Sequence, residues 1–295
     1  MTMPLPGGEI MKVTIIGAGA VGMLLATLFA EKGATVQVVA KRQEQADLIT
    51  YQGLIRDGSE FRVEALTDYA KIDRKAFVFV TVKQPHLAEV IPEIISHCPE
   101  QPLVFLQNGM LHLEQLSRLH NARIAAGSVE HGVKKIADNE ITHAGAGRIQ
   151  IAAVHGTGED FAPLLSDESI GVHWHDDVDR LLFRKTLVNC MINPLTALMG
   201  IKNGELLTNV HAYTLMKALY MELYGAFPEI EEMLPFEEVT ALCAATAENH
   251  SSMRADRQAG RKMELDTILH YTISRAPENL PLLRTLYHLL KSTEE

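Results

Sequence analysis

The sequence predicts an α/β Rossmann-type N-terminal domain followed by an all-α C-terminal domain. Three observations lead to this prediction: a glycine-rich turn near the start, alternating strand and helix patterns through the first half, and no strand pattern after residue 176. We therefore expect two domains, residues 1–176 and 177–295. Residues 1–10, with two prolines and two glycines, are expected to form a flexible leader.

Composition limits the classes of partner that the chain can have. Its 295 residues carry a formal charge of −10, which argues against binding to nucleic acid or to an anionic membrane surface. No apolar run is long enough to cross a membrane. The three cysteines are odd in number and far apart, which is typical of reduced thiols in a cytoplasmic protein.

The glycine-rich turn joins a β-branched run at residues 12–16 to a helical pattern at 23–32, and a second strand pattern follows at 35–39. A G-x-G-x-x-G turn in this strand–helix–strand setting is typical of dinucleotide binding, because glycines allow the backbone to approach a pyrophosphate at a helix N-terminus. A glycine-rich turn without a ligand is the alternative. The predicted cofactor-binding residues are Gly17, Ala18, Gly19, Ala20, Val21 and Gly22.

Two cations follow the second strand, where an NAD-binding site usually carries an acidic residue. The chain reads Ala40, Lys41, Arg42, and the first carboxylate is that of Glu44. Positive charges suit the 2′-phosphate of NADPH, so we predict NADP(H) as the cofactor. Either Lys41 or Arg42 could contact the phosphate, and the alternative is that both are solvated surface charges.

Further strand patterns occupy residues 54–63 (a hairpin with a turn at Asp57 and Gly58), 76–82, 102–106, 123–129, 140–142, 148–154 and 171–174. Lys83 and Asn108 follow two of the buried strands. Because ligands bind at the carboxyl ends of strands in open α/β sheets, both are candidates for cofactor or substrate contact.

The second half predicts helices at residues 180–199, 205–224, 236–256, 263–274 and 281–291. The first is apolar nearly all round, yet Lys185, Asn189 and Asn193 recur every four residues and so share one face. Buried polar groups need partners, and these could be structural or a substrate.

In this order the motifs resemble those of the ketopantoate reductase (2-dehydropantoate 2-reductase) family over residues 11–290. The segments that carry the resemblance are the glycine turn, Thr81-Val82-Lys83, Leu106-Gln107-Asn108-Gly109, Ile141-Thr142-His143 before Gly145, residues 185–197, Asn203-Gly204-Glu205-Leu206, residues 247–253 and Glu264-Leu265-Asp266.

The resemblance implies NADPH-dependent reduction of 2-dehydropantoate to pantoate in pantothenate and coenzyme A biosynthesis. By resemblance Lys185 is the proton donor, and Glu264 lies at the reaction centre. The implied substrate-binding residues are Asn189, Asn193, Asn203 and Ser252; the implied cofactor contacts include Lys83, Asn108 and Glu264. An ammonium on a buried helix suits proton donation, since desolvation lowers a lysine pKa.

Some residues depart from the family pattern and leave the exact 2-keto acid open. Met263 stands where threonine is common, and residues 267–270 are bulkier than the usual small-residue turn. The alternatives are a reductase of another branched 2-keto acid and, in a different class, a non-catalytic NADPH-binding sensor. We expect a small-molecule 2-keto acid as partner, and the sequence leaves a homodimer open.

The segment from His173 to Asp177 is the main metal-binding candidate. Two histidines share one face of a strand, but no third ligand is placed beside them, so we predict no metal site.

Overall fold

The protein was described from a computed structural model that covers residues 10–116, 118–165 and 170–294. The leader expected at residues 1–10 lies, apart from Ile10, outside the described residues. Two compact units are present: unit 1 comprises residues 1–107 and 112–181, and unit 2 comprises residues 108–111 and 182–295. This division falls within helix α6, and the domain limits 1–176 and 177–295 stay predictions. No described helix is both long and apolar enough to span a membrane.

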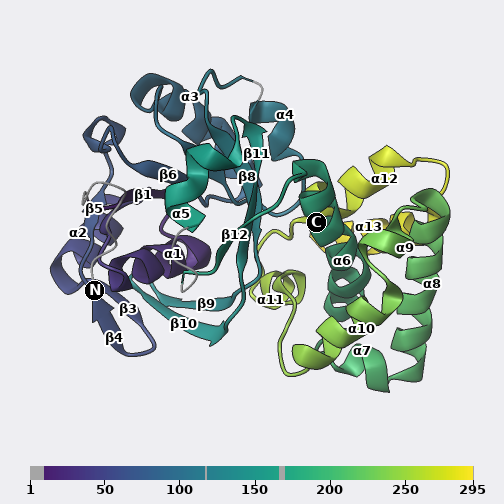
Figure 1. Cartoon of the computed structure of the whole chain (residues 1–295). Coiled ribbons are helices and arrows are strands. Elements are labelled where there is room, and N and C mark those ends of the chain that lie inside the picture. Colours follow the sequence, from purple (N-terminus) through teal and green to yellow (C-terminus); the bar gives the residue numbers. More distant parts are fainter. Residues whose placement is uncertain (1–9, 117, 166–169, 295) are drawn as a thin grey trace. The chain divides into compact units, whose positions relative to one another are not determined.

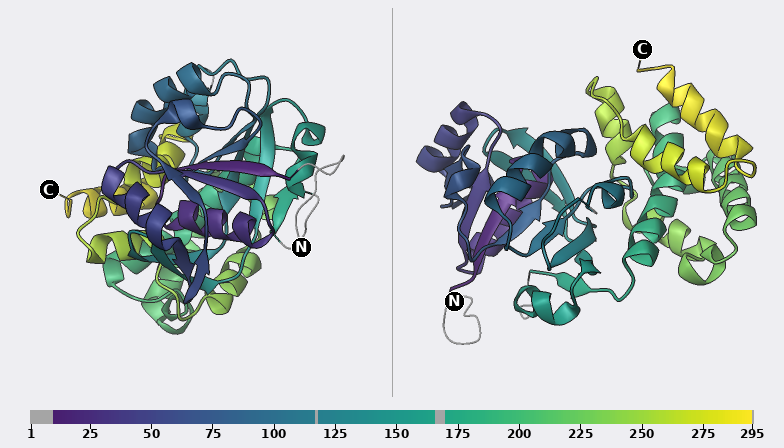
Figure 2. Two further views of the ribbon diagram at one scale, coloured as in Figure 1. Left: turned by 90° about the vertical axis from the view of Figure 1, so that its left-hand side faces the viewer. Right: turned by 90° about the horizontal axis from the view of Figure 1, so that it is seen from above.

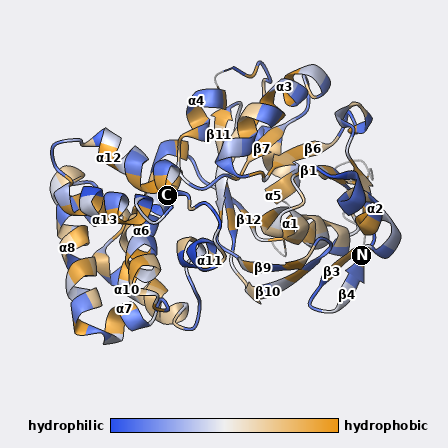
Figure 3. Ribbon diagram, turned by 180° about the vertical axis from the view of Figure 1, so that it is seen from behind, coloured by the Kyte–Doolittle hydropathy of each residue, from blue (hydrophilic) through white to orange (hydrophobic). Residues whose placement is uncertain are grey.

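Unit 1 contains an eight-stranded sheet of order β12-β11-β8-β7-β6-β1-β2-β5, whose strands from β8 to β5 are parallel. Strand β11 runs antiparallel to β8 and pairs in parallel with β12. The bounds are β1 Lys12–Ile16, β2 Thr35–Val39, β5 Glu64–Leu66, β6 Phe77–Val80, β7 Leu103–Phe105, β8 Ile124–Val129, β11 Ile149–His155 and β12 Val172–Trp174. The central strands are hydrophobic because both of their faces are covered (Figure 3).

A second sheet of four strands has the order β4-β3-β10-β9. The hairpin predicted around Asp57 and Gly58 is confirmed as β3 Leu54–Arg56 and β4 Ser59–Phe61. The strand predicted at residues 140–142 is confirmed as part of β10 Glu140–Gly145, which pairs with β9 Gly132–Ala137. Strand β9 was not predicted, since its outward side chains are mostly exposed and give little alternation.

Helix α1, Ala20–Glu31, lies between the two sheets (Figure 1). It contacts β1 and β2 on one side and β3, β4, β9 and β10 on the other. Its residues 22–29 are therefore buried all round, which explains a hydrophobic helix without a polar face. The same packing fixes the glycine turn that precedes it.

The remaining helices of unit 1 are α2 Gln43–Gln52, η1 Tyr69–Lys71, η2 Gln84–His86, α3 Leu87–His97, α4 His112–Leu116, η3 Gly158–Phe161 and α5 Ala162–Leu165. Residues 158–165 form a 3₁₀ turn followed by one short α-helical turn.

Unit 2 is helical, and two views of it appear in Figure 2. Its elements are α6 Val178–Met199 (with its first four residues in unit 1), α7 Glu205–Thr208, α8 Val210–Ala226, α9 Ile230–Met233, α10 Phe236–Ala245, α11 Ser252–Gln258, the π-helix η4 Asp266–His270, α12 Tyr271–Arg275 and α13 Pro281–Lys291. The long apolar helix predicted at 180–199 is confirmed as α6, with Pro194 inside it.

Two predicted helices are broken by capping side chains. The helix expected at 205–224 divides because Asn209 accepts hydrogen bonds from the backbone of His211 and Ala212 and starts α8. The helix expected at 236–256 ends at Ala245, and Ser251 starts α11 by accepting from the backbone N–H of Arg254.

The third wrong prediction is a single helix over 263–274, where the structure has a π-helical turn before α12. Asp266 at the start of this turn accepts from the Tyr287 hydroxyl at 2.9 Å and pairs with Lys291 at 3.0 Å. Both partners lie on α13, whose buried leucines Leu283, Leu286 and Leu290 each contribute about 2 kcal/mol through burial. Tertiary contacts with α13 thus hold this turn.

Candidate active site

The glycine turn has the shape that a dinucleotide-binding loop requires. Gly17 has φ +113°, and a Cβ on Gly22 would lie 1.9 Å from the carbonyl oxygen of Gly17. Both positions therefore exclude side chains. A Cβ on Gly19, in contrast, would meet no atom within 4 Å, and Gly19 is the N-cap of α1. The space beside Gly19 would admit a pyrophosphate at the helix N-terminus, and cofactor binding by residues 17–22 stays a prediction.

Two side chains that were not predicted as site residues, Thr81 and Gln45, hold this turn in place, and a third, Gln107, orders the end of β6. The Thr81 hydroxyl lies 3.1 Å from the carbonyl oxygen of Ile16 and 3.0 Å from that of Gly17. Gln45 Nε2 donates to the carbonyl oxygens of Ala18 and Asp138. Gln107 Nε2 donates to the carbonyl oxygens of Val80 and Val82, which orders the end of β6. Their signal in the sequence is weak, because an amide or hydroxyl near a strand end is common.

The two candidate phosphate-binding cations each face a carboxylate. Lys41 Nζ lies 2.7 Å from Glu89 Oε2, and the Arg42 guanidinium pairs with Asp138, which also accepts from Lys135. The bond to Lys41 lowers the pKa of Glu89; bonds to Lys135 and then Arg42 lower the pKa of Asp138. Both carboxylates are therefore ionised at neutral pH and compete with any phosphate for these cations.

Lys83 occupies the turn directly after β6 and is exposed there as the N-cap of η2. It belongs to unit 1, as do the glycine turn, Lys41 and Arg42. Asn108, the other residue predicted at a strand end, belongs to unit 2. Its Nδ2 donates to Glu264 Oε2 at 2.8 Å, so the structure brings together two predicted residues that are 156 positions apart.

The polar stripe on α6 is present as predicted by helical spacing. Lys185 and Asn189 are partly buried, and Asn193 is only 4% exposed. The Nδ2 of Asn193 is a buried donor that has no hydrogen-bond partner among the described residues. Since a buried donor without a partner is costly, this atom is a candidate contact for a ligand.

Asn203 also has an unused polar atom. Its Nδ2 donates to the Thr246 hydroxyl at 3.0 Å, whereas its buried Oδ1 has no partner within the described part of the chain. Asn193 and Asn203 thus supply a buried donor and a buried acceptor that the described residues leave without a partner. A ligand hydroxyl is both a donor and an acceptor and could satisfy either kind of group.

Ser252 is exposed on the first residue of α11. The preceding Ser251, which was not predicted as a site residue, is buried and shares a hydrogen bond of 2.7 Å with Thr196 on α6. Ser251 therefore fixes the start of α11 against α6, whereas Ser252 itself is exposed.

The cysteine on α6 is not a nucleophile. Burial raises the pKa of the Cys190 thiol to about 12, and its sulfur contacts the Thr272 hydroxyl at 3.3 Å. A thiol with so high a pKa is not ionised at neutral pH.

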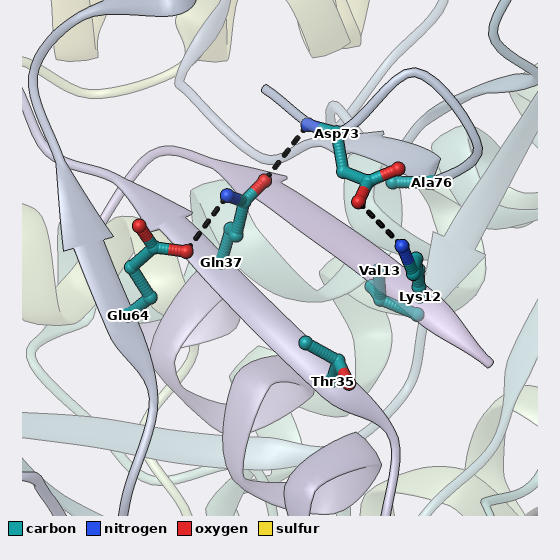
Figure 4. A pocket seen from close by; sticks show the side chains of 7 residues that line it. All are labelled: Lys12, Val13, Thr35, Gln37, Glu64, Asp73 and Ala76. Atoms are coloured by element: carbon teal, nitrogen blue, oxygen red, sulfur yellow. Dashed lines mark hydrogen bonds and ion pairs between the residues drawn. The ribbon is translucent and has the colours of Figure 1, made fainter. Parts of the chain in front are cut away.

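A small hollow of about 70 Å³ lies at the opposite, amino-terminal ends of β1 and β2 (Figure 4). Gln37 at its centre binds Thr14, Glu64, Lys71 and Asp73, and Lys12 pairs with Asp73 at 2.7 Å. Because these polar groups already bind one another, we interpret them as a structural hydrogen-bond network and not as a ligand-binding site.

The segment with two histidines comprises the end of β12 and a turn, and Asp177 in this turn accepts from the backbone N–H of Arg180 at 2.9 Å, which caps α6. Trp174 Nε1 donates to Asp176, and the backbone N–H of Asp177 donates to His175 Nδ1. Over residues 10–116, 118–165 and 170–294, no group of three or more His, Cys, Asp or Glu side chains is suited to hold a metal ion.

A Rossmann-type nucleotide-binding unit and a helical unit with a polar stripe define a class of two-unit, dinucleotide-binding proteins. Comparison with known proteins narrows this class. A family model described as ketopantoate reductase PanE/ApbA matches residues 13–156, and one described as the C-terminal part of the same family matches residues 177–294. The chain belongs to the ketopantoate reductase family of oxidoreductases.

Individual relatives cover nearly the whole chain. A 2-dehydropantoate 2-reductase of Listeria monocytogenes is 35% identical over 293 residues, which are 96% of this chain and 97% of the relative. The crystal structure of a probable 2-dehydropantoate 2-reductase of Bacillus subtilis is 35% identical, with a TM-score of 0.82 over 96% of this chain and 100% of that one. A D-mandelate dehydrogenase solved with NADH and anilino(oxo)acetate shares the fold, with a TM-score of 0.83 at 20% identity.

Proposed function

We propose that this protein reduces 2-dehydropantoate to pantoate with NADPH, in the biosynthesis of pantothenate and coenzyme A. The observation that carries the proposal is the stripe of Lys185, Asn189 and Asn193 on α6, in a chain 35% identical to a 2-dehydropantoate 2-reductase over nearly its full length. The keto acid substrate and cytoplasmic location are parts of this proposal. The location is supported by three unpaired, buried cysteines.

Residues of the glycine turn and of the segment after β2 suit the phosphate groups of NADPH. The open backbone at Gly19 suits the pyrophosphate, and Lys41 or Arg42 suits the 2′-phosphate that distinguishes NADPH from NADH. Lys83 and Asn108, which follow β6 and β7, are the further proposed contacts. When bound, NADPH supplies the hydride.

The reaction leaves negative charge on the ketone oxygen, so a proton donor must lie beside it. We assign this role to the ammonium group of Lys185. Glu264 is proposed as the carboxylate that orients the reaction centre, and its hydrogen bond to Asn108 gives it a fixed position. Asn189, Asn193, Asn203 and Ser252 are proposed to hold the substrate, and the two unsatisfied buried amide atoms of Asn193 and Asn203 support this.

One assay tests the function. Oxidation of NADPH is followed by absorbance with 2-dehydropantoate and, separately, with 2-oxoisovalerate. Turnover of 2-dehydropantoate with the higher kcat/KM supports the proposal. A preference for 2-oxoisovalerate would indicate a reductase of another branched 2-keto acid, and turnover of neither compound would leave only the cofactor-binding sensor.

A further inference from the structure

The carboxylate of Asp138 binds two cations that come from distant parts of the chain. Its Oδ1 accepts from Lys135 Nζ at 2.9 Å, and its Oδ2 accepts from the guanidinium of Arg42. Lys135 lies on β9, three residues before Asp138, whereas Arg42 is the N-cap of α2. Because each cation has its own oxygen, loss of the bond to Arg42 would leave the bond to Lys135 intact.

The turn that carries Asp138 is held in place by two buried amide side chains. Gln45 Nε2 donates to the carbonyl oxygen of Asp138 at 2.7 Å, and Asn139 Nδ2 donates to that of Gly53 at 3.0 Å. Both amides are buried, and breaking their hydrogen bonds would leave polar groups without partners. Asp138 therefore keeps its position when a ligand draws the side chain of Arg42 away from it.

Lys135 controls the charge of this carboxylate more strongly than Arg42 does. Both cations lower the pKa of Asp138, and the hydrogen bond from Lys135 is the larger cause. The ionised carboxylate competes with a 2′-phosphate for Arg42, and it would also repel a phosphate bound beside it. A second cation that stays on Asp138 reduces both effects, and Lys135 is placed to be that cation.

We propose that Lys135 is a specificity-determining residue for NADPH, because it holds Asp138 while Arg42 binds the 2′-phosphate. This inference rests on the proposed use of NADPH. Lys135 acts through Asp138: it weakens the competition for Arg42 in the free protein and neutralises the carboxylate once Arg42 has left it. NADH lacks the 2′-phosphate and requires no such exchange, so its binding should not depend on Lys135.

Dissociation constants for NADPH and NADH, measured by cofactor fluorescence, test the proposal. Lys135→Gln should weaken NADPH binding about 3- to 10-fold, as expected for a partly exposed ion pair, and should leave NADH binding unchanged. The matched control is Lys134→Gln, which removes the same charge from the opposite face of β9 and should retain both parent constants. An unchanged NADPH constant in Lys135→Gln, or an equal loss in both variants, would overturn the proposal.

A double substitution separates action through Asp138 from direct contact with the phosphate. In Asp138→Asn the competing charge is absent, so the addition of Lys135→Gln should change NADPH binding less than about 2-fold. A further loss of about 3- to 10-fold in this background would mean that Lys135 contacts the phosphate itself, and it would overturn the role through Asp138.

Neither measurement requires turnover of a keto acid. If the protein reduces neither 2-dehydropantoate nor 2-oxoisovalerate, the proposed reaction fails, while a loss of NADPH binding alone in Lys135→Gln still supports this inference. Equal constants for NADPH and NADH in the parent protein would overturn both the choice of NADPH and the role of Lys135.

Discussion

Asn108 Nδ2 donates a 2.8 Å hydrogen bond to Glu264 Oε2, which joins the turn after β7 to the residues just before the π-helix η4. A bond to a carboxylate is stronger than one between neutral groups, so the amide of Asn108 has a preferred orientation. Two residues proposed to border the reaction centre thus position one another.

The contribution of the negative charge of Glu264 to activity can be tested with a substitution that keeps the hydrogen bond from Asn108. Glu264→Gln can still accept from Asn108, but it loses the negative charge, and kcat/KM should fall about 10- to 100-fold. Asn108→Asp places a second carboxylate at this bond and should cause a larger loss together with a lower Tm. Steady-state kinetics and thermal unfolding measure both effects, and full activity in Glu264→Gln would show that its charge is not used.

Removal of the proposed proton donor should affect chemistry and not cofactor binding. Lys185→Ala should lower kcat roughly 10²- to 10⁴-fold, the usual contribution of a general acid. The NADPH dissociation constant, measured by cofactor fluorescence, should stay at the parent value. Lys217→Ala on α8 serves as the control for loss of one lysine. A parent-like kcat in Lys185→Ala would remove this residue from the proposed role.

Cofactor choice should depend on the balance between the two cations and their carboxylate partners. The double change Lys41→Ala and Arg42→Ala should weaken NADPH binding much more than NADH binding, since only NADPH carries the 2′-phosphate. Asp138→Asn should act in the opposite direction, because it releases Arg42 from its ion pair. Dissociation constants for both cofactors test this, and equal changes for NADPH and NADH would mean that the phosphate is bound elsewhere.

Two glycines of the same turn should respond differently to alanine. A Cβ at Gly22 would overlap the Gly17 carbonyl oxygen, so Gly22→Ala should destabilise the fold by about 3 kcal/mol. A Cβ at Gly19 has open space, so Gly19→Ala should fold normally yet bind NADPH more weakly. Urea unfolding and cofactor titration separate the two. Normal NADPH affinity in Gly19→Ala would argue against pyrophosphate binding at this backbone.

His112 should make stability depend on pH. Burial lowers the pKa of His112 to about 4, and both ring nitrogens lack partners among the described residues. The unfolded chain, with a histidine pKa near 6.5, therefore binds the proton more readily between about pH 4 and 6.5. The free energy of unfolding therefore has its full value, as far as His112 is concerned, above about pH 6.5, and it decreases as the pH falls toward 4.

The free energy of unfolding measured in urea at pH 7 and pH 5 checks this. His112→Leu should remove about 2 kcal/mol of the decrease that the parent protein shows between these pH values. An equally steep decrease in both proteins would assign the pH dependence to other groups.

The sequence by itself determined the strand–helix alternation of the first half, the helical second half, the glycine turn and the stripe on α6. These depend on local physics: β-branched runs favour strands, Gly22 excludes any larger residue, and a four-residue repeat lies on one face of a helix. The sequence also contains the helix caps Asn209 and Ser251. Because strong helical patterns flank both caps, the sequence analysis predicted continuous helices through these two positions.

Only the tertiary structure decided which side chains meet. The pairs Asn108–Glu264, Arg42–Asp138 and Ser251–Thr196 join residues far apart in the chain, and each depends on how whole elements pack. Residue type and local spacing reveal which groups could take part in chemistry, whereas burial and partner choice arise only when distant elements exclude water from between them.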